Sequence, residues 1–224
     1  MELSLVEIWE SMGLLARLVA IALVFMGVAS LAVSFDRLFV LRRFARDSNL
    51  FAGKARTLLE AGEFEALKDL ARGMPRAPLA RLTLAGLPPF TDHRGAGISA
   101  AEAARRELAR KLEEYGQEAR RGMSLLASVG STSPFIGLFG TVLGIITAFQ
   151  GLAAAGGGGI GAVSAGIAEA LIVTAVGLFV AIAAVLFYNY LSGRFDRLDM
   201  TMQHAAGELL DYLETSDGRG DRVG

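Results

Sequence analysis

Glu169 is the only residue charged at neutral pH between Arg121 and Arg194. A carboxylate in so apolar a stretch is costly to bury, and within membranes such groups mark ion pathways by default. Burial favours the neutral form of a carboxyl group, so that this residue can exchange a proton. We therefore interpret Glu169 as part of a proton pathway. The alternative is a structural hydrogen-bond anchor.

Hydroxyl side chains in the same apolar stretch would give such a pathway polar neighbours. Ser131, Ser133 and Thr141 precede the carboxylate, and Thr174 follows it. Taken alone, each hydroxyl more often satisfies the backbone of its own helix. Pro134 is expected to kink its helix and to free a carbonyl oxygen for a hydrated path. These residues are candidates for a pore lining.

Other kinds of chemistry find little support. The 224 residues include no cysteine and only His93 and His204, which disfavours a thiolate nucleophile or a histidine-rich metal centre. Gly156, Gly158 and Gly161 satisfy G-x-G-x-x-G, but no strand precedes them, and no P-loop motif is present. A net charge of -1 provides no basic field for nucleic acid. We expect no enzyme activity, no cofactor, no metal and no nucleic-acid partner.

The elements that position the carboxylate are predicted to lie in a lipid bilayer. A mean hydropathy of +0.45 exceeds the soluble norm, and each crossing of a bilayer needs about 20 apolar residues. The uncharged runs predict transmembrane helices at 13–35, 123–154 and 162–192, with a glycine-rich periplasmic turn at 155–161 between the last two. The sequence thus predicts an all-α membrane protein with three transmembrane helices.

The remaining segments are expected to be mostly helical and charged. Ser99 and Glu102 form a capping box, and nothing after them stops the helix before the second span. Pro88-Pro89 marks a break. The further segments are a periplasmic amphipathic N-terminus at 1–12, a cytoplasmic helical region at 36–122, a cytoplasmic helix at 193–214 and a disordered tail at 215–224.

The distribution of charge predicts the orientation. The first residues carry Glu2, Glu7 and Glu10 but no base before Arg17, the reverse of a signal peptide. An uncleaved first span with a periplasmic N-terminus and a cytoplasmic C-terminus places every Lys and Arg except Arg17 on the cytoplasmic side.

Small residues recur at helical spacing in the second and third spans. They permit close contact between helices in lipid, and either the chain's own three helices or neighbouring protomers could use them. Because three helices cannot easily cover so many small faces, we expect a homo-oligomer. The residues expected to pack helices are Gly137, Gly140, Gly144, Gly177 and Ala181.

Two segments together resemble a known family. SVGSTSPFIGLFGTVLGIITAF at Ser128–Phe149, followed by AVSAGIAEALIVTAVGLFVAI at Ala162–Ile182 and by Tyr188-Asn189, is similar to the TolQ/ExbB branch of the MotA/TolQ/ExbB proton-channel family. The resemblance implies a homopentameric ring in a bacterial inner membrane. The ring would surround the membrane helices of a smaller ExbD/TolR-like partner, which has one span with an intramembrane aspartate.

The resemblance also implies roles for particular residues. Glu169, Thr141 and Thr174 would lie on the path of protons, the coupling ion, and proton flow would drive work on a periplasmic client through a TonB/TolA-like or motility-linked transducer. Ala165 and Ala183 stand where the family usually has proline, so we expect a straighter third span. A non-conducting scaffold for the single-span partner and a sodium-driven relative are the alternatives.

Overall fold

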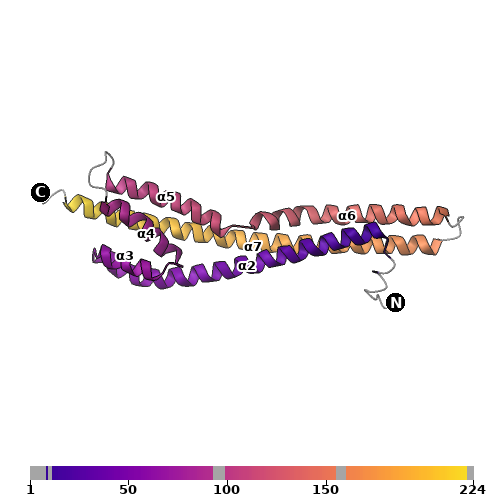
Figure 1. The fold of residues 1–224 in the computed structure, drawn as a ribbon, viewed down its shortest axis with the longest axis horizontal. Coiled ribbons are helices and arrows are strands. Elements are labelled where there is room, and N and C mark those ends of the chain that lie inside the picture. The colour runs from indigo at the N-terminus through magenta and orange to yellow at the C-terminus, as the bar shows by residue number, and fades with distance from the viewer. Residues whose placement is uncertain (1–8, 10–11, 93–98, 155–159, 221–224) are drawn as a thin grey trace. The chain divides into compact units, whose positions relative to one another are not determined.

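The protein folds into helices that form two compact units. The structure, a computed structural model, describes residues 9, 12–92, 99–154 and 160–220. One unit, the membrane unit, contains the described residues up to Asp36 and Gly122–Tyr190. The other, the extension unit, contains Arg37–Arg121 and the described residues from Leu191 onward. The helices are α2 (Leu14–Glu60), α3 (Phe64–Gly73), α4 (Pro78–Asp92), α5 (Ala100–Ala119), α6 (Met123–Ala154) and α7 (Ile160–Gly220) (Figure 1).

Three of these helices, α2, α6 and α7, are long and apolar enough to cross a membrane. This confirms the prediction of an all-α chain with three candidate spans. Phe25, Phe135 and Phe179 are 74%, 71% and 73% exposed, so large apolar side chains cover the outside of the membrane unit. Such a surface suits lipid or another apolar partner rather than water. α7 runs without interruption through Ala165 and Ala183, as expected where proline is absent.

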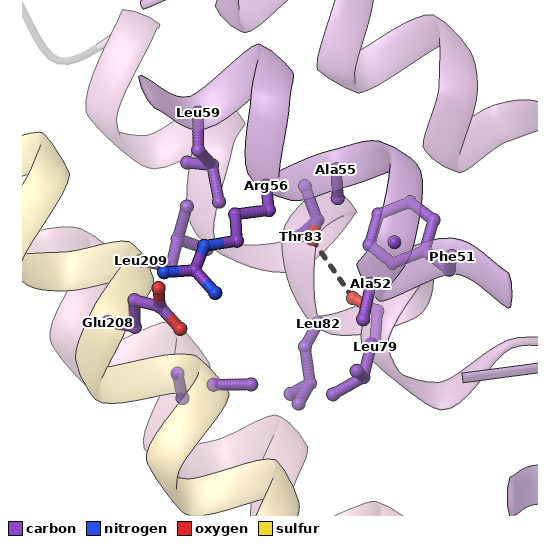
Figure 2. A pocket seen from close by; sticks show the side chains of 13 residues that line it. Phe51, Ala52, Ala55, Arg56, Leu59, Leu79, Leu82, Thr83, Glu208 and Leu209 are labelled. Atoms are coloured by element: carbon purple, nitrogen blue, oxygen red, sulfur yellow. Dashed lines mark hydrogen bonds between the residues drawn. The ribbon is translucent and has the colours of Figure 1, made fainter. Parts of the chain in front are cut away.

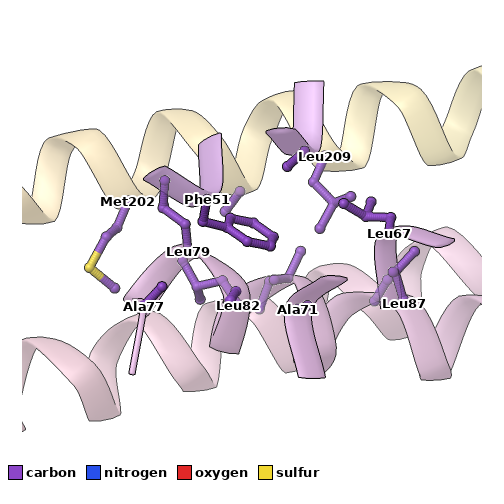
Figure 3. Close-up of a cluster of buried hydrophobic side chains, with 14 of the residues drawn as sticks. Phe51, Leu67, Ala71, Ala77, Leu79, Leu82, Leu87, Met202 and Leu209 are labelled. Carbon is purple, nitrogen blue, oxygen red and sulfur yellow. The ribbon is translucent and has the colours of Figure 1, made fainter. Parts of the chain in front are cut away.

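The extension unit has its own apolar core. Each of its helices contributes, and the most deeply buried side chains include Phe51 from α2, Leu67 from α3, Leu87 from α4, Leu108 from α5 and Leu213 from α7. Figure 3 shows several of these side chains meeting beside α7. Each is at most 2% exposed, so hydrophobic burial stabilises this unit.

The start of α5 agrees with the prediction, but its end does not. Ser99 Oγ accepts a hydrogen bond of 3.1 Å from the backbone N–H of Glu102, which is one of the two hydrogen bonds of the predicted capping box. The helix was expected to run directly into the second span, and this prediction is wrong. α5 ends at Ala119 and α6 begins at Met123.

The break between α5 and α6 has a local cause. Gly122 has φ +83°, a conformation that other residues adopt only with strain. A β-carbon there would also lie 3.2 Å from Val33 Cγ1. Arg37 Nη1 donates to the carbonyl oxygens of Glu118 and Ala119, at 3.1 and 3.2 Å, and so satisfies acceptors that the end of a helix leaves open.

Two further predictions need correction. α4 continues past Pro88-Pro89 to Asp92. The side chain of Leu87, immediately before them, is 1% exposed in the core, so tertiary packing offsets the lost backbone hydrogen bonds. α7 continues to Gly220, beyond the expected start of a disordered tail at Thr215. The Thr215 hydroxyl donates to a carbonyl oxygen one turn earlier at 2.7 Å, and no proline stops the helix there.

Some predictions concern residues outside the described part of the chain. The amphipathic N-terminus falls there except for Trp9 and Met12, as do residues 155–159 of the glycine-rich turn and the last four residues of the tail.

We expect Leu67→Ala to destabilise the extension unit by about 2–5 kcal/mol, because truncation leaves a cavity in a fully buried site. Hydrogen exchange of the full chain in detergent should show amide protection in α4 reduced by about 30-fold or more. Leu50→Ala is the matched control, since that side chain is 54% exposed. Equal effects of the two substitutions would contradict the assignment of Leu67 to the core.

Candidate functional site

A hollow of about 310 Å³ lies among α2, α6 and α7 within the membrane unit. Two of its lining residues, Thr147 and Glu169, have polar side chains, and the others have at most a methyl group. These small lining residues are Gly13, Ala16, Gly144, Ala148, Ala165, Gly166 and Ala170. The space exists because three helices meet where almost no side chain is large enough to fill it.

Glu169 brings the titratable group to this hollow. The side chain is half-buried, and among the residues that the structure describes its carboxylate has no hydrogen-bond or ion-pair partner. A carboxylate without a partner within a candidate span is costly, and no described residue of the protomer uses Glu169 as a structural anchor. Binding and release of a proton by Glu169 stay a prediction.

Thr147 is the one polar neighbour of Glu169 in this lining, and it is not among the residues predicted from the sequence. Its hydroxyl donates to the carbonyl oxygen of Leu143 at 2.9 Å, and the hydroxyl oxygen keeps its capacity to accept a hydrogen bond. One signal in the sequence could have identified it. Thr147 is a hydroxyl residue near the end of the second span, and Glu169 lies near the start of the third, so both are close to the predicted periplasmic turn.

The predicted pore hydroxyls of α6 do not line the hollow. Thr141, Ser131 and Ser133 each donate to a carbonyl oxygen three or four residues earlier, at 2.6, 3.1 and 2.7 Å respectively. Such bonds to the same helix are the ordinary use of these side chains. A role for these residues in proton transfer stays a prediction.

Thr174 has a different partner, because its hydroxyl links two helices. It donates to the carbonyl oxygen of Gly137 at 2.8 Å and so joins α7 to α6. Nearby, a β-carbon on Gly177 would lie 2.7 Å from the carbonyl oxygen of Ser133 and 3.0 Å from Gly137 Cα. The two backbones can approach this closely only because both positions are glycine.

Pro134 lies inside α6, next to this contact. Proline has no N–H group, so the carbonyl oxygen of Gly130, four residues earlier, lacks its usual helical donor. A β-carbon on Gly130 would lie 2.6 Å from Val185 Cγ2, so this part of α6 is also packed tightly against α7.

The five small residues predicted to pack helices make their contacts within one protomer. A β-carbon on Gly140 would meet Val173 Cγ1 at 2.7 Å, and one on Gly144 would meet Ala170 Cβ at 2.7 Å. Ala181 is buried at 5% exposure. Packing of the chain's own helices was the alternative use of these residues, so they no longer argue for a homo-oligomer.

A second hollow, of about 380 Å³, lies in the extension unit (Figure 2). Arg56 from α2 and Glu208 from α7 stand at an otherwise mostly apolar lining. Arg56 Nε donates to Glu60 at 3.0 Å; this hydrogen bond and the charge of Glu60, followed by that of Glu208, raise the pKa of Arg56. The Thr83 hydroxyl is already bonded to a carbonyl oxygen of its own helix, the dashed line of Figure 2. The side chains of Arg56 and Thr83 at this hollow are thus already engaged within the protein.

Metal binding finds no support in the described ranges, since no three His, Asp or Glu side chains there gather at one place.

Comparison with known proteins gives a consistent result. A family model described as the MotA/TolQ/ExbB proton channel family matches residues 76–204, more than half of the chain. The biopolymer transport protein ExbB of Salmonella typhimurium is 30% identical over 222 residues, which cover 96% of this chain and 88% of that protein.

Other relatives match over shorter segments. ExbB of Xanthomonas campestris is 39% identical over 133 residues. The match covers 51% of that protein, so the chain spans about half of its length. The Tol-Pal system protein TolQ of Pseudomonas aeruginosa is 55% identical over 76 residues, covering 34% of this chain and 33% of that protein.

We expect Gly177→Ala to destabilise the membrane unit by about 1–3 kcal/mol, because the added methyl group would meet backbone atoms that cannot move aside. The midpoint of thermal unfolding in detergent should fall by several degrees. Gly193→Ala, also within α7, is the matched control: its β-carbon would meet nothing within 4 Å, and alanine favours a helix over glycine. A Gly177→Ala protein as stable as wild type would contradict the close α6–α7 contact.

Thr174→Val should lower stability by about 0.6 kcal/mol, and by no more than about 1.7, because it removes one interhelical hydrogen bond within a membrane. Thr174→Ser keeps the hydroxyl and should retain most of that stability. Both can be compared by reversible unfolding in mixed detergent. If the valine variant matches wild type and the serine variant does not, the hydrogen bond is not the reason for a hydroxyl at this position.

Proposed function

Because the chain belongs to the MotA/TolQ/ExbB proton channel family, we propose that it is the conducting, ring-forming subunit of a proton-driven motor in a bacterial inner membrane. The observation that supports this most directly is the carboxylate of Glu169, which stands at a hollow within the candidate spans and has no hydrogen-bond or ion-pair partner among the described residues. Protons are the coupling ion, and the chain itself catalyses no covalent reaction.

The proposed mechanism uses protonation of Glu169 to change the charge within the membrane. Ionised, the group is attracted to water or to a cation; neutral, it can pack against an apolar surface. A membrane potential of 100 mV supplies about 2.3 kcal/mol for each proton that crosses, so several protons can drive one substantial conformational step. Thr174 holds α7 in place against α6 during this step, through Gly137.

The proposed partners follow from the resemblance and from the surface of the membrane unit. Exposed apolar side chains on α6 and α7, among them Phe135, Phe139 and Phe179, support a pentamer of this chain around the single span of an ExbD/TolR-like protein. An aspartate in that span would exchange protons along the path of Glu169, Thr141 and Thr174. Relatives named ExbB and TolQ support a TonB-, Tol- or gliding-type client.

The proposed orientation places the N-terminus in the periplasm and the C-terminus in the cytoplasm. Every Lys and Arg except Arg17 falls in residues that belong to the extension unit or follow it in the tail. The positive-inside rule then favours an extension unit in the cytoplasm.

We expect Glu169→Gln to abolish proton flux, because the amide keeps the shape of the side chain but cannot take up and release a proton at neutral pH. The measurement is proton uptake into liposomes that carry the chain with its co-purified single-span partner, under an imposed potential. Flux should fall to the level of empty liposomes while the size of the complex is unchanged. Glu113→Gln, on the exposed surface of α5, is the control and should conduct like wild type.

The same assay distinguishes the alternatives. Wild-type flux in the Glu169→Gln sample, or no flux from either intact complex, would favour the non-conducting scaffold. Flux that requires sodium, and stops when potassium replaces it, would favour the sodium-driven relative.

A further inference from the structure

We propose that the hollow beside Glu169 is a water-filled access route, through which protons reach the carboxylate from one face of the membrane inside a single protomer. The inference rests on the proposed function and adds to it the side from which Glu169 is loaded. It assigns Thr147 as the second polar group of the route and Gly13 as the residue that keeps it open.

The position of the hollow in the membrane unit suits an entrance. Gly13 immediately precedes α2, Ala148 lies two turns before the end of α6, and Ala165 lies in the second turn of α7. All three are therefore at the same end of the membrane unit. Glu169 is nine residues along α7 from Ile160, about 14 Å at 1.5 Å per residue. On the proposed orientation this end faces the periplasm, from which the proton motive force drives protons inward.

The size and chemistry of the hollow suit water. At about 310 Å³ it has room for several water molecules, each of which occupies about 30 Å³ in the liquid. Its lining offers the carboxylate of Glu169 and the hydroxyl of Thr147 as hydrogen-bonding groups. A lipid chain in the same place would remove water from the carboxylate of Glu169, for which no described residue supplies a hydrogen bond, and this is unfavourable.

The glycines that line the hollow have two different roles. Some allow close packing of helices, whereas Gly13 leaves the route open. A β-carbon on Gly166 would lie 2.7 Å from Ala148 Cβ, too close to be accepted without movement. One on Gly13 would lie 3.5 Å from Thr147 Cγ2, an ordinary contact. The absence of a side chain at Gly13 is therefore not required for packing against Thr147, and its effect is to leave space.

The chain has no cysteine, so an introduced thiol is a unique reporter of water at its position. The test compares two variants of the full chain, each reconstituted into liposomes with the co-purified single-span partner. T147C places the thiol in the hollow, and I146C places it at the neighbouring residue. Ile146 is 48% exposed but does not line the hollow. A small, charged, membrane-impermeant thiol reagent should modify T147C about tenfold or more faster than I146C, since such a reagent does not enter lipid.

Modification should also block the route. After complete reaction, the Glu169-dependent proton flux of T147C should fall at least fivefold relative to the same sample before reaction, and that of I146C should not change. A165C, at an exposed position that also lines the hollow, repeats the test should T147C fail to assemble.

The outcomes separate this inference from the proposed function. Thiols in the hollow that stay unmodified, or modified samples that keep their full flux, would overturn the access route while Glu169-dependent conduction stands. Flux that is the same with and without Glu169→Gln in these samples would overturn the proposed function, and the access route with it.

Discussion

The close contact between the backbones of α6 and α7 is the constraint on which the rest of the membrane unit depends. Lipid supplies no hydrophobic force that brings helices together, so close packing and interhelical hydrogen bonds must do so. At Gly177 the two helices approach until a single β-carbon would be too close to the carbonyl oxygen of Ser133, and the Thr174 hydroxyl bonds to Gly137 beside it. Together these contacts fix the rotation of α7 about its own axis, and with it the direction in which Glu169 leaves the helix.

The hollow is the counterpart of this packing. Toward the end of α6, α6 and α7 still touch through glycine and alanine, but Gly13, just before α2, and Ala16, in its first turn, leave space there instead of filling it. A carboxylate at such a place can keep contact with water while it stands within the apolar thickness of the membrane, which lowers the cost of burying it. The small residues of this region therefore have two consequences: they allow α6 and α7 to pack closely, and they leave space beside the carboxylate of Glu169.

The sequence was informative wherever a property of a single helix decided the outcome. Hydropathy predicted the three candidate spans, and the isolation of Glu169 among uncharged residues singled it out. The break at Gly122 was missed although a glycine after a basic pair is a usual helix end, because no proline lies between Glu102 and the second span to stop the helix. Thr147 could have been noticed as a hydroxyl near the periplasmic end of the second span, but its meeting with Gly13 could not be predicted, because it depends on how the start of α2 is placed against α6. The small residues have the same spacing whether they pack one protomer or several, so the spacing could not choose between these uses.

The contacts near the hollow also constrain how this chain can change over evolution. Two of these contacts each join one glycine to one alanine. In one pair Gly144 of α6 meets Ala170 of α7, and in the other Gly166 of α7 meets Ala148 of α6. Each contact has room for one methyl group and not for two. An exchange of the two residues within a pair conserves that room, whereas either change alone removes or doubles the methyl group. Among relatives that keep this helix crossing, the members of each pair should therefore vary together, as reciprocal substitutions, and not independently.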